Sequence, residues 1–156
     1  MKILFVCTGN ICRSPTAEAM FLAQLAKLDA TSQSHIYCDS AGTHGYHIGE
    51  SPDARTITAA RKRGVDMTKL VARKVSPEDY EIFDVILAMD ATHLAWLHHN
   101  APANSKAFIA MYLEYAGITH TQDVPDPYYA GAEQFETVLN LIIEASEKII
   151  VNCART

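Results

Sequence analysis

The feature that most constrains the fold is an alternation between short apolar segments and longer segments with helical periodicity. Residues 2–6 are an apolar run rich in branched and aromatic side chains, and Gly9 follows shortly after. Such a run is typical of a buried strand, here expected to be the first and central one. From Ser14 onward apolar residues recur every three or four positions, at Ala17, Phe21, Leu25 and Leu28. The first segment is therefore predicted to be strand, loop and helix.

The same alternation continues along the chain. We expect strands at 35–39, 84–89 and 106–110, helices at 52–63 and 94–98, and a long final helix through Phe135 and Ile150. Parallel strands need crossover connections, so this order predicts an α/β fold with a parallel sheet and helices on both faces. Ligands of such folds bind at the carboxyl ends of the strands. The loop after the first strand is the leading candidate site, and the Pro- and Gly-containing loop 119–131 is a second.

The size and charge of the chain exclude several classes of protein. A chain of 156 residues, 49% hydrophobic and 20% charged, is expected to form one globular domain. Its net charge of -5 argues against binding nucleic acid or an anionic membrane by bulk attraction. No apolar stretch approaches the roughly 18 residues of a membrane span, and the first apolar run is too short for a signal peptide. We therefore expect a cytoplasmic protein.

The loop from Cys7 to Pro15 carries the clearest functional signal. Its sequence, CTGNICRSP, leads from a strand into a helix N-terminus, with Gly9 and Asn10 available for unusual backbone angles. Backbone N–H groups of such a turn can converge on an anion. The loop lacks the Gly-Lys-Ser/Thr of a nucleotide-binding loop and the three spaced glycines of a dinucleotide fold. It is predicted to be a phosphate-binding loop with a thiol at its entrance.

The residue types in this loop suit nucleophilic catalysis. The converging N–H groups should favour the thiolate of Cys7, which is the nucleophilic form. Arg13 can direct two donors onto two phosphoryl oxygens, which a lysine could not do. Ser14 is placed to donate a hydrogen bond to the sulfur. A free cysteine is more often a small buried apolar residue, so the prediction rests on its place between strand and helix.

Three segments, 7–15, 39–43 and 126–129, resemble the signatures of the low-molecular-weight protein tyrosine phosphatases, and the resemblance runs the length of the chain. It implies a single domain with a four-stranded parallel sheet, a cysteinyl-phosphate intermediate, and no metal or organic cofactor. Cys7 would be the nucleophile, Arg13 the phosphate clamp and Asp126 the general acid. The implied substrate-binding residues are Thr8, Gly9, Asn10, Ile11, Cys12, Ser14, Tyr46 and Tyr128, with Ser40 and Tyr129 supporting them.

The expected chemistry independently requires an acid. A phenolic leaving group has a pKa near 10 and departs poorly as an anion, so a carboxylic acid must protonate it. Asp126 fits this role, and Pro127 restrains its backbone. Asp126-Pro127 could instead be only a turn, and Asp123 is a nearby rival.

Selectivity is expected from the walls of the pocket. Tyr46 and Tyr128 could flank a phenyl ring, or either could be surface packing. Relatives selective for phosphoarginine carry Thr where this chain has Ile11, so Ile11 indicates phosphotyrosine. Family members commonly have a His in the segment that reads KLVAR at 69–73, so a polar network behind the loop is rebuilt or missing here.

Alternatives remain open on the same fold. An arsenate reductase would need two further cysteines, and Cys38 and Cys153 are badly placed for that relay. A thiol redox switch, or a phosphotyrosine-binding module without activity, would use Cys7 and Cys12 as a sensing pair. In the enzyme, Cys12 is expected to trap an oxidised Cys7 as a disulfide.

The expected partner is a phosphotyrosine-containing protein: a tyrosine kinase, an exported-polysaccharide regulator or a host protein. No nucleic acid or membrane partner is expected. The predicted state is a monomer or weak dimer.

Overall fold

The computed structural model describes residues 1–156 and contains one four-stranded sheet. Its strands are β1 (Lys2–Cys7), β2 (Tyr37–Gly42), β3 (Val85–Ala88) and β4 (Phe108–Met111). All neighbours pair in parallel, in the order β2-β1-β3-β4. The predicted parallel sheet with the first strand at its centre is confirmed.

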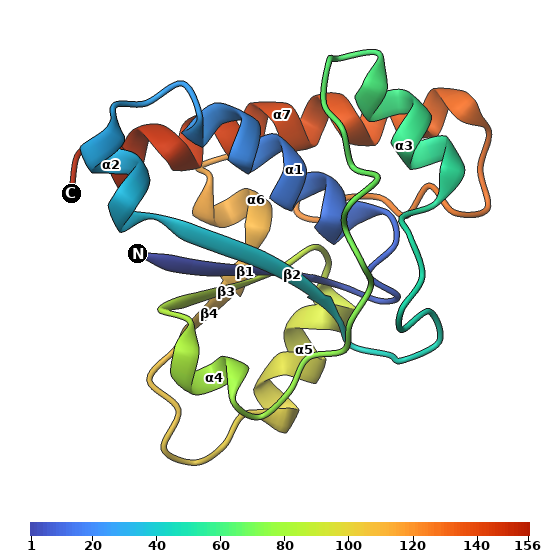
Figure 1. Cartoon of the computed structure of the whole chain (residues 1–156). Coiled ribbons are helices and arrows are strands. Elements are labelled where there is room, and N and C mark those ends of the chain that lie inside the picture. The colour runs from blue at the N-terminus through green and yellow to red at the C-terminus, as the bar shows by residue number, and fades with distance from the viewer.

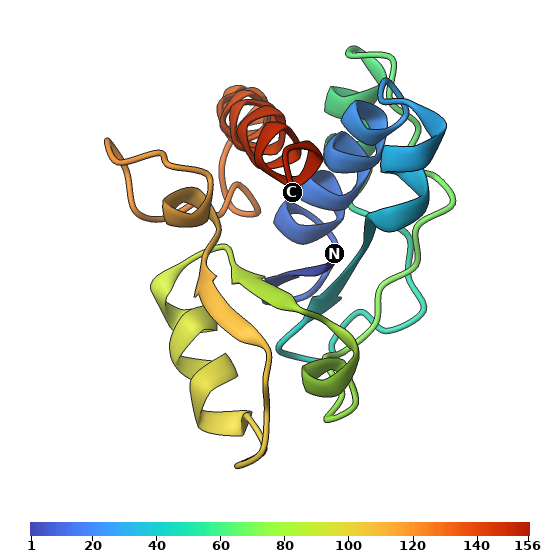
Figure 2. The same cartoon turned by 90° about the vertical axis from the view of Figure 1, so that its left-hand side faces the viewer.

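Helices cover both faces of this sheet (Figure 1). They are α1 (Arg13–Leu25), α2 (Ala30–His35), α3 (Ala54–Arg61), α4 (Asp79–Ile82), α5 (Ala91–Asn100), α6 (Tyr112–Tyr115) and α7 (Ala132–Ala154). Helices α1, α3 and α7 lie over one face, and α4 and α5 over the other, as the rotated view of Figure 2 also shows. No helix, not even the 23-residue α7, combines the length and apolarity needed to cross a lipid bilayer.

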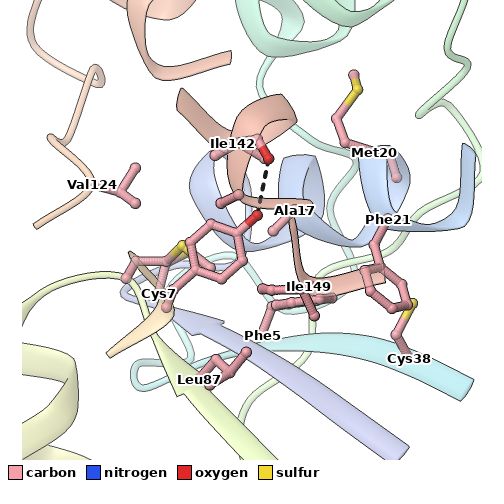
Figure 3. Packing of buried hydrophobic residues seen from close by; sticks show 14 of the residues in the cluster. Phe5, Cys7, Ala17, Met20, Phe21, Cys38, Leu87, Val124, Ile142 and Ile149 are labelled. Carbon is pink, nitrogen blue, oxygen red and sulfur yellow. Dashed lines mark hydrogen bonds between the residues drawn. The ribbon is translucent and has the colours of Figure 1, made fainter. Parts of the chain in front are cut away.

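The alternation of side chains along β1 divides the core in two. Ile3, Phe5 and Cys7 point into a cluster of 31 buried residues beneath α1 and α7. Leu4 and Val6 point into a smaller cluster of 10 residues beneath α4 and α5. Figure 3 shows the larger cluster, in which Cys7 lies at one end of the packed side chains. Because β1 is buried on both faces of the sheet, its sequence is a continuous apolar run.

The carboxyl ends of the central strands are brought together with the distant loop 119–131. Cys7 at the end of β1 is in register with Gly42 at the end of β2. The N–H of Val124 in the loop donates to the carbonyl of Met89, which directly follows β3 (2.8 Å). The topology thus places three loops from distant parts of the sequence around one edge of the sheet.

Several expected boundaries were wrong. The strand expected at 35–39 lies at Tyr37–Gly42, and α2 precedes it. Helix α2 is capped by Asp29, whose side chain accepts from the Ser32 N–H (3.0 Å), and it buries none of its residues. A short polar helix has no apolar periodicity to detect. The strand expected at 106–110 likewise lies at 108–111, and the four-residue helices α4 and α6 were not predicted.

Candidate active site

The loop between β1 and α1 takes its shape from Asn10 and Gly9. Asn10 has a φ of 57°, the only positive φ outside glycine in the chain. At Gly9 the absence of a side chain leaves room for His47, because a Cβ there would lie 2.9 Å from Cδ2 of His47. Of the two residues expected to supply unusual backbone angles, Asn10 supplies the left-handed conformation and Gly9 permits the close approach of His47.

The Asn10 side chain organises a buried hydrogen-bond network behind the loop. Its Oδ1 accepts from the N–H of Arg73 (3.0 Å), and its Nδ2 donates to Ser14 Oγ (2.8 Å) and Ser40 Oγ (2.9 Å). Both amide hydrogens are therefore used, and both hydroxyls act as acceptors toward Asn10. Each hydroxyl keeps its own proton for another partner. Ser14 Oγ lies 3.0 Å from Cys7 Sγ and 3.4 Å from the carbonyl oxygen of Ala41, so the sulfur is the nearer of two acceptors for its proton.

The second branch of the network ends on Glu18. Ser40 Oγ donates to Glu18 Oε2 at 2.5 Å, and the Glu18 side chain is almost fully buried in α1. Burial raises the pKa of Glu18 to about 7, against the lowering effect of this hydrogen bond. Asp39 adds a further increase and Arg73 opposes it. Glu18 is therefore only partly ionised near neutral pH.

The segment 69–73 contributes no histidine to this network. In the segment 69–73, Leu70 is half-buried and Val71 is exposed, so neither replaces a polar side chain. Arg73 supplies its backbone N–H to Asn10, and its guanidinium forms ion pairs with Asp39 (3.0 Å) and Asp79 (2.9 Å). The loop is thus held from behind by a buried polar cluster whose charges are paired.

Both cysteines of the loop are free and buried. Cys7 is 3% exposed and reaches the pocket in front of the loop. Burial raises the pKa of Cys12 to about 12, against the lowering effect of the nearby Thr56 side chain. Cys12 therefore remains a neutral thiol at physiological pH, whereas Cys7 has a hydroxyl donor beside it.

Arg13 is buried but keeps donors free. Its Nη1 donates to Asp90 Oδ2 (2.7 Å) and to the carbonyl of Val124 (3.1 Å). Nη2 lies 3.5 Å from Asp126 Oδ2, and neither Nη2 nor Nε donates a hydrogen bond within the chain. The guanidinium is therefore fixed at one nitrogen while two neighbouring donors remain available for a ligand.

Asp90 holds Arg13 in this position. It follows β3 and caps α5, accepting from the N–H groups of Thr92 (2.9 Å) and His93 (3.2 Å). Burial acts to raise the pKa of Asp90, but hydrogen bonds from Thr92 and Arg13 outweigh it and hold the pKa at about 2. Asp90 is therefore a permanent anion, fixed by the helix that it caps.

Asp126 and Asp123 occupy different positions. Asp126 lines the pocket, with its carboxylate about half exposed and Oδ1 accepting from the Tyr128 N–H (3.0 Å). Asp123 is exposed, and its Oδ1 accepts from the N–H of Ala91 at the start of α5 (3.1 Å). Of the two rival acids, Asp126 is the one that faces the pocket.

The cavity in front of the loop has a volume of about 310 Å³. The residues that line it are Cys7, Thr8, Gly9, Ile11, Cys12, Arg13, Tyr46, His47, Asp126, Tyr128 and Tyr129. Of the site residues predicted from sequence, Asn10, Ser14 and Ser40 lie behind the loop rather than in the cavity. The others share its walls.

Aromatic rings form the rim of this cavity. Tyr46, 76% exposed, stacks on His44 with ring centroids 5.3 Å apart. Tyr128 packs edge-on against Tyr129 (4.9 Å) and tilts toward His47 (6.5 Å). Tyr46 is thus both a surface residue and a wall of the cavity, and its contact with a substrate ring stays a prediction.

Sequence reasoning missed four residues of the site: Glu18, His47, Asp90 and His93. Asp90 had a detectable signal, because it directly follows the buried run 84–89 and so stands at the carboxyl end of a strand. The spacing of Asp90 and His93 also fits a capping pair. Glu18 had no local signal, since its partner Ser40 is far away in sequence. His47 pairs with the nearby Glu50 (2.7 Å), but its approach to Gly9 comes only from the tertiary fold. No group of three or more His, Cys, Asp or Glu side chains in the chain could hold a metal ion.

Comparison with known proteins gives a consistent result. Residues 2–156 match the profile described as "Low molecular weight phosphotyrosine protein phosphatase". A protein of that name from Schizosaccharomyces pombe is 37% identical, over 99% of this chain and 97% of its own. The low molecular weight protein-tyrosine-phosphatase YfkJ of Bacillus subtilis is 40% identical, over 97% and 95% of the two chains.

Solved structures agree with the sequence comparison. The crystal structure of YfkJ matches with a TM-score of 0.88 and 39% identity, over 97% of this chain and 93% of that one. A crystal structure described as a Drosophila arginine phosphatase also has a TM-score of 0.88, at 31% identity and 97% coverage of both chains.

Proposed function

The chain belongs to the low molecular weight phosphotyrosine protein phosphatase family, and from this we propose which residues perform its reaction. It is a cysteine-dependent protein tyrosine phosphatase, and its substrates are phosphotyrosine-containing proteins. The observation that carries the assignment of roles is that Cys7, Arg13 and Asp126 line one cavity, with free donors on Arg13 beside the thiol.

In the first step we assign Cys7 as the nucleophile. Its sulfur attacks phosphorus, an S–P bond forms, and the bond from phosphorus to the tyrosine oxygen breaks. Asp126 gives its proton to that oxygen, so tyrosine leaves as a neutral phenol. Nε and Nη2 of Arg13, together with the loop N–H groups, bind the oxygens of the transferring group. Asp90 keeps the guanidinium in place by holding Nη1.

In the second step water hydrolyses the phosphocysteine. The Asp126 carboxylate removes a proton from the attacking water, the new P–O bond forms, and the S–P bond breaks. The Ser14 hydroxyl, 3.0 Å from the sulfur, stabilises the departing thiolate by a hydrogen bond. Asn10 supports this role because it occupies the acceptor side of Ser14.

For selectivity we propose that the cavity walls favour an aryl phosphate over a guanidinium phosphate. Ile11 lines the cavity with an apolar side chain, and Tyr46 and Tyr128 add aromatic surface to its rim. A phenyl ring gains by burying apolar area there, whereas a charged guanidinium would lose hydration without a polar partner at Ile11. Comparable kcat/KM values for phosphoarginine and phosphotyrosine would contradict this selectivity.

The test of the assigned roles is the loss of turnover in two conservative variants. Cys7→Ser removes the thiol, and Arg13→Lys replaces the paired donors with a single point charge. Each is expected to retain less than about a hundredth of wild-type kcat on phosphotyrosine, since each removes an interaction that the reaction depends on. Arg61→Lys, on the exposed end of α3, is the matched control and should keep full activity. Substantial activity in either site variant would refute the roles.

The alternative functions fit the site less well. A disulfide relay needs further cysteines near the nucleophile, but Cys38 is buried in β2 and Cys153 lies near the end of α7. Neither lines the cavity. The comparisons likewise favour the phosphatase over an arsenate reductase or a redox switch.

We also propose that Cys12 protects Cys7 from irreversible oxidation. Peroxide converts the Cys7 thiolate to a sulfenic acid, and attack by Cys12 sulfur then forms a disulfide and releases water. Because the pKa of Cys12 is about 12, this trapping should become faster as pH rises. After brief peroxide treatment and thiol reduction, wild type should recover activity and Cys12→Ser should not. Equal recovery would contradict the protective role.

The physiological substrate, location and assembly state are further proposals. A cytoplasmic location suits an enzyme whose nucleophile must stay reduced. A tyrosine kinase is one candidate substrate, beside an exported-polysaccharide regulator or a host protein, and a Cys7→Ser pulldown from native lysate would identify it. We expect a monomer or weak dimer, which size-exclusion chromatography with light scattering can test.

A further inference from the structure

His93, which the mechanism above does not use, has a fixed orientation beside the phosphate loop. It lies in the first turn of α5, is 2% exposed, and its Nδ1 accepts the backbone N–H of Asp90 (3.2 Å). Asp90 Oδ1 is also 3.2 Å from Nδ1, but that oxygen already accepts from both Thr92 donors and from the His93 N–H. Nδ1 therefore carries no proton, and the ring is neutral.

The surroundings of His93 support the neutral form. Burial, aided by the nearby charge of Arg13, lowers the pKa of His93 to about 4, although the carboxylates of Asp90 and Asp126 act in the opposite direction. His44 adds a small further decrease. A neutral imidazole without a proton on Nδ1 must carry it on Nε2.

This proton fixes the direction of the next hydrogen bond. Nε2 lies 2.7 Å from Thr8 Oγ1, so His93 donates and the Thr8 hydroxyl accepts. A hydroxyl that accepts one bond still has its own hydrogen to donate. Thr8 Oγ1 has no other hydrogen-bond partner in the chain, and Thr8 lines the cavity that contains Cys7, Arg13 and Asp126.

We propose that the Thr8 hydroxyl is a substrate-binding donor to an oxygen of the bound phosphate group, and that His93 is the positioning residue that turns its proton toward the cavity. The proposal rests on the phosphatase function above. It adds a neutral side-chain donor to the charged donors of Arg13 and to the backbone N–H groups. A purely structural pair would tie α5 to the loop without altering affinity for phosphate.

The direct test compares the affinity of three forms for inorganic phosphate, measured by calorimetry and so independently of turnover. Thr8→Val keeps the size and branching of the side chain but removes the hydroxyl, and should weaken phosphate binding about tenfold. Thr8→Ser should restore affinity to within about twofold of wild type. Thr31→Val, at an exposed position of α2, is the control and should change nothing. Unchanged affinity in Thr8→Val would overturn the proposal.

The positioning role of His93 needs a double-mutant cycle. His93→Leu removes the ring donor and should weaken phosphate binding when Thr8 is present, but add little in the Thr8→Val background, because both changes act on the same hydroxyl. Equal effects in both backgrounds would refute the link between the two residues. His99→Leu, exposed at the far end of α5, is the matched control. If His93→Leu fails to fold, Thr8→Val and Thr8→Ser decide the proposal.

Phosphate affinity also separates this proposal from the proposed function. Wild type that binds phosphate but does not turn over phosphotyrosine would refute the function alone. Active wild type whose phosphate affinity and kcat/KM are both unaffected by Thr8→Val would refute the role of Thr8 alone.

Discussion

Two features of Asp126 fit the acid and base role that we propose for it. Its carboxylate is about half exposed, so it can exchange protons with water between the two steps. It is also oriented by two contacts, since Oδ1 accepts a hydrogen bond from the Tyr128 N–H and Oδ2 lies 3.5 Å from the charged Nη2 of Arg13. A bound phosphoryl group would compete with Asp126 for Arg13 and so release Oδ2 toward the leaving oxygen. The contact with Arg13 therefore suits the free enzyme.

The first prediction tests Asp126 through the leaving group. A general acid matters most when the leaving oxygen departs poorly without a proton. With phenyl phosphate or phosphotyrosine, Asp126→Ala should lower kcat by about 10²–10⁴, with little change in KM. With a strongly acidic phenol as leaving group the loss should be much smaller. Steady-state kinetics over a series of aryl phosphates measures this dependence.

Asp123→Ala is the control for that series. Asp123 accepts from the Ala91 N–H and does not line the cavity, so its loss should leave kcat nearly unchanged for every leaving group. An equal loss in Asp126→Ala for all leaving groups would instead indicate a structural role for Asp126.

At the scale of elements, the loop 119–131, which carries Asp126, is held by two helices. Arg13 at the start of α1 donates to the carbonyl of Val124, and Arg55 in α3 donates to the carbonyl of Tyr128 (2.9 Å). The Arg55 guanidinium also lies over the rings of Tyr128 (5.6 Å) and Phe135 (4.6 Å). The segment that carries Asp126 is therefore anchored on both sides of the acid.

The second prediction concerns the anchor in α3. Arg55→Met keeps an apolar stem but removes the hydrogen bond to Tyr128, and an ordinary hydrogen bond contributes about 0.5–1.5 kcal/mol. We expect kcat/KM for phenyl phosphate to fall about threefold to tenfold. If Arg55 acts by positioning Asp126, the loss should shrink in the Asp126→Ala background.

The matched control is Arg61→Met, a change of the same kind on the exposed last turn of α3. It should leave the kinetics unchanged. A loss in Arg55→Met that is the same with and without Asp126 would show that Arg55 affects binding in some other way.

The difference in predictability between elements has a physical cause. The strands β1 and β3 and the helices α1 and α7 could be predicted because each buries many apolar side chains at regular spacing. Helix α2 could not, since Asp29 and a row of polar residues stabilise it locally without burial. The same distinction holds in the site: the loop 7–15 is contiguous in sequence, whereas the Thr8–His93 contact joins residues 85 positions apart. Only the tertiary fold reveals such pairs.

At the scale of the whole molecule, a buried hydrogen-bond network joins the phosphate loop to the core. Glu18 on α1, Ser40 on β2 and Asn10 in the loop are joined by hydrogen bonds that cross the boundary between sheet and helix. Burying the Glu18 carboxylate disfavours its charged form, although Arg73 compensates in part. This unfavourable burial occurs at a position where the Glu18 side chain helps to order the phosphate loop through Ser40 and Asn10.

The last prediction follows from that cost. The pKa of Glu18 is about 7 in the folded chain and 4.5 for an unperturbed glutamate. An acid whose pKa is raised by folding favours the folded state below its unfolded pKa, and this advantage disappears as pH rises from about 4.5 through 7. Glu18→Gln cannot ionise, yet its amide oxygen can still accept from Ser40. Relative to wild type, its free energy of unfolding should therefore be similar at pH 5 and higher at pH 8, by about 3 kcal/mol at most.

Urea unfolding at both pH values measures the difference, with the exposed Glu147→Gln on α7 as control. If the gap between Glu18→Gln and wild type does not widen between pH 5 and pH 8, Glu18 is already ionised and stably paired in the folded protein.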